Sequence, residues 1–284
     1  MKISFTIIML LLCRMCFGAI PELSIFAGRK TEIPIKLIHL KGQPFNWTLK
    51  FKHRTIDDGN GIVDVNGKAV IELKIPAVKP GVIMNTVLKV GEQVIRKVRI
   101  YYPNPFKDAV LSSQLLLWDA ENESPIKEFL LQFKLPYETT YSLASGHSEN
   151  IQLIFGIDLE NQPGIPEKML KACRKGGTII CFLPEKTSVT FPGAGIKNIT
   201  IEKNTYGSEH KLQFEQKGSL TISNSPADEG CNGIMVAVPP GKIFFYPVCR
   251  IATMQNLPSE LYSFANILIS NKKKEKKDEK DVNF

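Results

Sequence analysis

The sequence predicts a multidomain protein in which an all-β sandwich precedes an α/β domain with a mainly parallel sheet and antiparallel additions. Before Pro103 apolar and polar residues alternate, whereas after it apolar residues occur in continuous runs and at helical spacing. A length of 284 residues also suits two domains. We divide the chain into an N-terminal segment 1–18, a front domain 19–103, a rear domain 104–271 and a tail 272–284.

The N-terminal segment predicts export. Lys2 precedes an almost wholly apolar run, Ile3–Cys13, which is shorter than the ~20 residues that a membrane-spanning helix needs. Such a run fits a secretory signal peptide, and small residues at Cys16 and Gly18 place cleavage after Gly18. The alternative is a buried N-terminal helix. We expect a periplasmic or extracellular protein whose mature chain, from Ala19, has no membrane span.

Strands in the front domain are indicated by residues that alternate between apolar and polar. The clearest cases are 45–51 and 69–75. Further strands are expected at 23–27, 33–39, 61–65, 82–90 and 94–100, with turns that include Asp57–Gly61 and Asn66–Gly67. Several short strands without a helical period indicate a β-sandwich. This pattern resembles the immunoglobulin-like domains common in bacterial surface proteins, although no cysteine pair spans it.

The positive charge of the chain is concentrated in the front domain. The net charge is +8, and residues 19–103 hold 14 Lys and Arg against 7 Asp and Glu. Lys50, Lys52 and Arg54 follow one another at every second position, so on a single strand they would share a face. We expect contact with an anionic surface; the alternative is a solvated lysine-rich face. The predicted export and the lack of a basic-aromatic motif argue against nucleic acid as a partner.

After a proline-containing linker, 103–106, the pattern becomes that of an α/β domain. Buried strands are expected at 115–118, 137–142, 151–157 and 178–183, with helices that begin at Pro125 and Pro166. Strands and helices that alternate through short connections indicate a largely parallel sheet. Antiparallel strands are expected at 196–202, 211–214, 220–223, 233–238 and 242–246, before a helix that starts at Pro258. The charged tail should be disordered.

The rear domain resembles the class I glutamine amidotransferase-like fold, a flavodoxin- or Rossmann-like architecture. The residues that carry this resemblance are Leu115–Asp119 with its helix, Ile154–Asp158, Cys173–Ile180, and Pro239–Tyr246 with the last helix. Active members of that family place a nucleophilic cysteine on a tight turn after a strand, with a His-x-Glu downstream.

Those catalytic features are missing from this chain. Cys181 lies within its strand, between Ile180 and Phe182, where no elbow would expose a thiolate. The only matching His-x-Glu, His147–Glu149, precedes that strand instead of following it. The resemblance therefore implies a domain that lacks the catalytic triad. Four cysteines remain after signal cleavage, namely Cys173, Cys181, Cys231 and Cys249, and they are either reduced core residues or paired in one or two disulfides.

One acidic cluster is the candidate ligand site of the rear domain. Its members follow two of the predicted parallel strands and are Asp119, Glu121, Glu123, Ser124, Asp158 and Glu160. The carboxyl ends of such strands are where these sheets bind ligands. Hard oxygen ligands suit Ca²⁺ or Mg²⁺. The alternative is structural: Asp119 and Ser124 cap the next helix, and the glutamates are solvated.

These observations favour an exported, non-enzymatic binding or scaffolding protein of the cell envelope, without a cofactor. Its expected partner is an envelope protein or a glycan. The alternative is a metal-assisted hydrolase that uses Asp119, Glu121 and Asp158. The two hypotheses differ in whether those carboxylates converge in one pocket.

Overall fold

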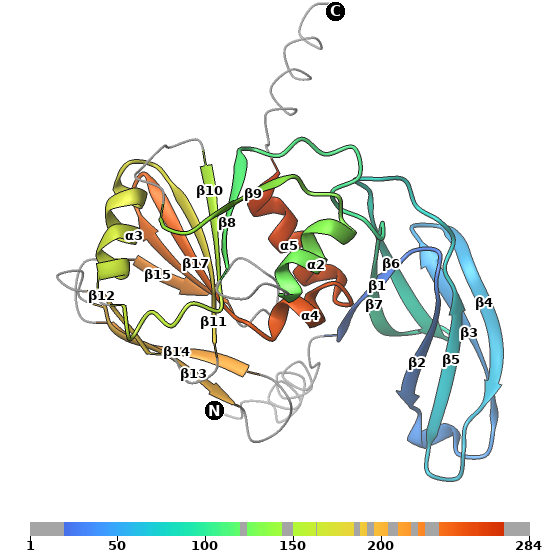
Figure 1. The fold of residues 1–284 in the computed structure, drawn as a ribbon. Coiled ribbons are helices and arrows are strands. Elements are labelled where there is room, and N and C mark those ends of the chain that lie inside the picture. The colour runs from blue at the N-terminus through green and yellow to red at the C-terminus, as the bar shows by residue number, and fades with distance from the viewer. Residues whose placement is uncertain are drawn as a thin grey trace, which may run out of the picture. The chain divides into compact units, whose positions relative to one another are not determined.

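The computed structural model of the chain is mostly β, with sheets of parallel and antiparallel strands and few helices (Figure 1). The residues it describes are 20–119, 124–143, 150–162, 164–184, 188–191, 196–203, 210–216, 221–224 and 233–269. The predicted signal segment 1–18 and the tail 272–284 lie outside them. In the part described, no helix has both the length and the apolar character needed to cross a membrane. The chain divides into two compact units between Pro103 and Asn104.

The first unit contains two sheets that enclose one core. Five strands pair in the order β1-β7-β6-β3-β4, and β2 pairs with β5. Their bounds are β1 (Glu22–Phe26), β2 (Lys30–Lys36), β3 (Pro44–Phe51), β4 (Arg54–Ile62), β5 (Lys68–Lys74), β6 (Ile83–Val90) and β7 (Gln93–Tyr101). All ladders are antiparallel except β1 with β7. Ile33 and Ile71 from the small sheet share a buried cluster with Trp47, Leu88 and Val98 from the large one.

Three sequence predictions for the strands of this unit are wrong. Of the strand expected at 61–65, only Gly61 and Ile62 lie in a strand. Residues 57–61, expected to form a turn, lie inside β4. The glycines are needed within this strand. Gly59 pairs with Trp47 and Gly61 with Phe45, and the absence of a Cβ leaves room for the two aromatic rings. The strand expected at 33–39 ends at Lys36 and is followed by a short 3₁₀ helix, η1 (Ile38–Leu40).

The second unit is built on a seven-stranded sheet in the order β15-β16-β17-β11-β10-β8-β9. Its bounds are β8 (Gln114–Asp119), β9 (Tyr137–Thr140), β10 (Asn150–Phe155), β11 (Thr178–Leu183), β15 (Thr221–Asn224), β16 (Ile234–Val238) and β17 (Gly241–Pro247). Neighbours from β9 to β17 run parallel, whereas β16 and β15 are antiparallel additions. A separate sheet joins β12 (Ser188–Phe191), β13 (Ile196–Lys203) and β14 (His210–Gln216).

Four helices lie in the part of the second unit that the structure describes. They are α2 (Pro125–Gln132), α3 (Gly164–Arg174), α4 (Arg250–Met254) and α5 (Pro258–Leu268). The predicted starts of α2 at Pro125 and α5 at Pro258 are confirmed, and α3 begins two residues before Pro166. Figure 1 shows α3 on one side of the large sheet and α2, α4 and α5 on the other.

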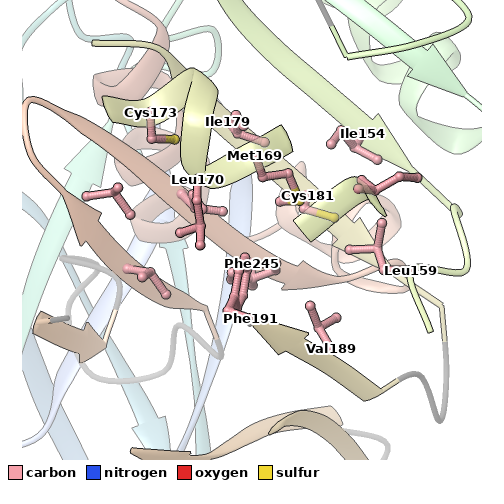
Figure 2. Close-up of a cluster of buried hydrophobic side chains, with 14 of the residues drawn as sticks. Ile154, Leu159, Met169, Leu170, Cys173, Ile179, Cys181, Val189, Phe191 and Phe245 are labelled. Carbon is pink, nitrogen blue, oxygen red and sulfur yellow. The ribbon is translucent and has the colours of Figure 1, made fainter. Parts of the chain in front are cut away.

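Strand alternation divides the core of this unit into two layers. Ile154, Cys181 and Phe245 are register partners on adjacent strands and belong to the cluster that contains the α3 residues Met169 and Leu170 (Figure 2). The next residues along the same strands are Phe155, Phe182 and Tyr246, which pack on the opposite face. Phe182 and Tyr246 contact Phe264 of α5, and an aromatic cluster continues from there to Phe129 of α2.

Candidate functional site

The sheet places the ends of β8 and β10 side by side. Asp119, the last residue of β8, is the register partner of Phe155, the last residue of β10. The order of the parallel strands reverses between these two strands, since the chain passes from β8 to β9 on one side and to β10 on the other. Ligands bind at such reversals, beyond the carboxyl ends of the strands. Asp119 and the turn after β10 that contains Asp158 therefore lie at the same edge of the sheet.

Asp119 is engaged within the protein. Its side chain is 1% exposed, it accepts a hydrogen bond from the Ser124 hydroxyl, and the Lys127 ammonium lies 3.2 Å from its Oδ2. Ser124 is the residue before α2, but its side chain makes no capping bond to the helix. The carboxylate thus ties the end of β8 to the first turn of α2. The Lys127 ammonium and the Ser124 hydroxyl thus occupy the Asp119 carboxylate within the protein.

The residues after β10 form an exposed turn. The Asp158 carboxylate accepts hydrogen bonds from the backbone N–H of Glu160 at 3.1 Å and from the Asn161 side-chain amide at 2.5 Å. Glu160 in turn accepts a long bond, 3.5 Å, from the backbone N–H of Ser188. A short carboxylate that bonds to backbone amides two or three residues on is a common turn device. Asp158 and Glu160 therefore shape the loop between β10 and α3.

The described members of the acidic cluster do not form a metal centre. Across the part of the chain that the structure describes, no three His, Cys, Asp or Glu side chains are grouped so that they could hold an ion. Asp119 and Ser124 are joined by a hydrogen bond, whereas Asp158 and Glu160 are bonded to a different loop. The other two predicted members, Glu121 and Glu123, lie outside the described residues.

Cys181 lies inside β11, as predicted. It is fully buried, and its neighbours Ile180 and Phe182 are fully buried as well. Figure 2 shows its side chain within the cluster that also holds Met169 and Ile154. Desolvation raises the pKa of the Cys181 thiol far above its ordinary value. A protonated thiol without access to solvent cannot act as a nucleophile at neutral pH.

Of the other cysteines, Cys173 is a free thiol, Cys249 is half-buried, and Cys231 lies outside the described residues. Cys173 is buried on α3, where its thiol donates to the Lys242 carbonyl oxygen at 3.4 Å. Burial raises the pKa of this thiol to about 12, although the hydrogen bond to Lys242 acts in the opposite direction. Cys173 is a core residue of the α3 layer.

The predicted basic face of the front domain needs a correction. Lys50, Lys52 and Arg54 do not lie along one strand, because β3 ends at Phe51 and β4 begins at Arg54. Lys52 has a φ of 53° and forms the turn between them with His53. The three cations instead gather at the tip of a hairpin, where Lys50 is half-buried and Lys52 and Arg54 are exposed. The turn was missed because Lys52–His53 contains neither Gly nor Asn, the usual residues at positive φ.

Two pockets lie away from the predicted acidic cluster. One, of about 560 Å³, is at the opposite edge of the large sheet, where Thr178 and Lys242 begin their strands and Ser263 and Asn266 project from α5. The other, of about 520 Å³, is in the first unit and is lined by residues of β2, β5 and β7 together with Asp64. Neither pocket has a local sequence signature, because each is assembled from segments far apart in the chain.

No family model matches the chain, and no curated protein matches it significantly in sequence.

Proposed function

We propose that the chain is an exported, non-enzymatic binding or scaffolding protein of the cell envelope. In this proposal the first unit is an immunoglobulin-like sandwich, and the second is a class I glutamine amidotransferase-like domain without a catalytic triad. The partner is an envelope protein or a glycan. Export rests on the apolar segment Ile3–Cys13 and the small residues that follow it.

The burial of Cys181 is the observation that carries the non-enzymatic part of the proposal. This cysteine occupies the strand that would lead to the nucleophile in an active amidotransferase, but it is 0% exposed and lies between two buried residues. The carboxylate of Asp119, at the end of β8, could also take part in chemistry. It is hydrogen-bonded to Ser124 and ion-paired with Lys127. Both side chains stabilise the fold, which leaves a binding role as the better explanation of the domain.

The order of the parallel strands supports the proposed architecture. Numbered along the chain, β8, β9, β10, β11 and β17 lie in the order 2-1-3-4-5, which is the order of flavodoxin-like sheets. Helices on both faces and a closing strand followed by a terminal helix agree with it. The two sheets of the first unit, which share one core, are in turn typical of a β-sandwich.

The decisive experiment compares catalysis with binding in the same preparation. The full-length protein, purified from the envelope fraction, is assayed against amide, ester and phosphate-ester substrates with and without Ca²⁺ or Mg²⁺. We expect no turnover, and no change in melting temperature on adding either ion. The same protein should retain binding to isolated envelope glycan or envelope protein when Cys181 is changed to Ala.

A metal-dependent turnover that is lost in Asp158→Asn would instead support the hydrolase built on Asp119, Glu121 and Asp158. Asp158 is the right residue to change, because it is exposed and its loss should leave the sheet intact, whereas Asp119 is part of the fold. N-terminal sequencing of the same material tests export separately: we expect Ala19 as the first residue, and an intact Met1 on cytosolic protein would contradict export.

A further inference from the structure

The pocket of the first unit is lined by Arg96, an arginine on the core-facing side of β7. Arg96 in β7 is the register partner of Leu88, which is fully buried, and Val98 two residues on is fully buried as well. Alternate residues of a strand share a face. The Arg96 side chain is half-buried and lines the pocket together with Ile35 and Ala69 of the small sheet. A guanidinium in this position needs acceptors for its five N–H groups.

No described residue of the first unit is bonded to the Arg96 guanidinium. Within the described residues, the structure gives Arg96 neither an ion pair nor a hydrogen bond, although Asp64 lines the same pocket. The Asp64 carboxylate is engaged in its own turn, where Oδ1 accepts the backbone N–H of Asn66 at 2.8 Å and that of Lys68 at 2.7 Å. A half-buried guanidinium that has no bonded acceptor is suited to an anionic ligand, whose oxygens would accept its N–H groups.

Two lysines of the small sheet add to the charge at this place. Lys36 and Lys68 are directly opposed in the β2–β5 ladder, and both are exposed and line the pocket. Like charges that face each other across a ladder are destabilising. At the other end of the same ladder the charges are compensated diagonally, since Lys30 forms an ion pair with Glu72 at 2.5 Å. The next pair on the same face of this ladder is Pro34 with Val70. Their side chains are uncharged and cannot compensate the two lysines.

The rest of the lining is apolar. Ile35 and Ala69 face the core, and Val70 is 57% exposed. An exposed β-branched side chain beside an uncompensated pair of lysines is suited to a ligand that has both an anionic group and an apolar group. Three cations against one carboxylate match a phosphate monoester, which carries close to two negative charges at neutral pH, better than they match a single carboxylate.

We propose that this pocket binds an alkyl phosphate. Arg96 holds the phosphate oxygens in the geometry that guanidinium groups favour. Lys36 and Lys68 neutralise the remaining charge, and the alkyl group lies against the exposed Pro34 and Val70, which share a face with the two lysines. The ligand is a free phosphate ester or the head group of an anionic lipid. The site belongs to the first unit alone and does not depend on whether the second unit is an enzyme.

The test uses the full-length protein and soluble probes in calorimetric titrations at pH 7 and physiological salt. We expect hexyl phosphate to bind, inorganic phosphate and hexanoate to bind at least about 10-fold more weakly, and hexanol not to bind. Arg96→Gln should weaken hexyl phosphate about 10-fold or more, the usual effect of losing a charge-assisted hydrogen bond. Arg174→Gln is the matched control, because it removes the same charge from an exposed position of α3 in the second unit.

A second variant covers the case in which Arg96→Gln does not fold. Lys36→Gln with Lys68→Gln changes two exposed residues and should also weaken hexyl phosphate, with an unchanged melting temperature in the absence of ligand. Vesicles of phosphatidic acid, compared with vesicles of phosphatidylcholine, then identify the source of the phosphate group. Binding to phosphatidic acid vesicles that requires Arg96 assigns a lipid head group. Absence of vesicle binding assigns a free phosphate ester. The proposal is overturned if the wild-type protein does not bind hexyl phosphate or if Arg174→Gln weakens it as much as Arg96→Gln.

Discussion

Arg250 and Glu260 form a buried ion pair that joins α4 to α5, with the guanidinium Nη2 2.7 Å from the carboxylate Oε1. The two side chains are only 9% and 7% exposed. The pair lies beside buried residues of the same helices, Ile251 and Leu261. It fixes the two helices that follow the last strand of the large sheet.

Removing one partner of this pair should destabilise the protein strongly. Arg250→Met leaves a buried, uncompensated carboxylate, and the expected loss is about 3–5 kcal/mol in the free energy of unfolding, measured by urea denaturation. The double variant Arg250→Met with Glu260→Leu should recover much of the loss, because no buried charge is then left without a partner. A loss below about 1 kcal/mol in the single variant would show that the pair is accessible to water.

The buried thiols should be unreactive in the folded protein. In a chain that starts at Ala19 and carries Cys231→Ser and Cys249→Ser, the remaining cysteines are Cys173 and Cys181. They should react with a thiol reagent at pH 8 only after urea is added, since both are fully buried. Reaction in the absence of urea at the rate of a free thiol would contradict this burial.

Alkaline pH should lower stability through the same thiols. The pKa of Cys173 is raised from 9.0 to about 12 in the folded state, so above pH 9 the unfolded chain loses a proton that the folded chain keeps. The stabilising contribution is therefore complete below pH 9 and declines as the pH rises toward 12. The urea midpoint should fall over this range, and the fall should be smaller in Cys173→Ala.

Adding a methyl group to β4 should destabilise the sandwich. A Cβ at Gly59 would lie 2.8 Å from the Trp47 ring, and one at Gly61 would lie 2.8 Å from the Phe45 ring. Gly59→Ala should reduce the free energy of unfolding by about 1–3 kcal/mol, as overpacking does. Asn60→Ala is the control on the exposed side of the same strand. Stabilisation by Gly59→Ala, the ordinary result in a strand interior, would contradict the close contact with Trp47.

The basic hairpin tip should control attachment to anionic vesicles. Changing Lys50, Lys52 and Arg54 to Glu should reduce binding of the full-length protein at low salt, because it reverses three charges at one place. The matched control changes Lys168, Lys171 and Arg174 to Glu, three exposed residues of α3. Wild-type binding should weaken steeply by ~0.5 M salt, where exposed charges are screened within a few ångströms. Equal losses in both variants would indicate a general charge effect instead of a hairpin contact.

Local patterns of residues were sufficient to predict several features of this fold. The apolar runs that became β10 and β11 could be located because strands covered on both faces lack polar residues. The starts of α2 and α5 could be located because proline at the first helical position favours a helix start. Cys181 could be placed in a strand core because bulky apolar residues flank it.

Tertiary structure alone decided the rest, because it depends on residues far apart in the chain. Asp57–Gly61 has the composition of a turn, and only Trp47 and Phe45 opposite its glycines make it a strand. The sequence around Asp119 also suits a metal ligand. Only the folded chain shows that Lys127 and Ser124 contact its carboxylate. Arg96 interrupts an apolar pattern in the sequence, but its pocket exists only because β2 and β5 pack beside β7. The spacing of apolar residues predicts which face of a helix or strand is buried, but it does not predict which partner covers that face.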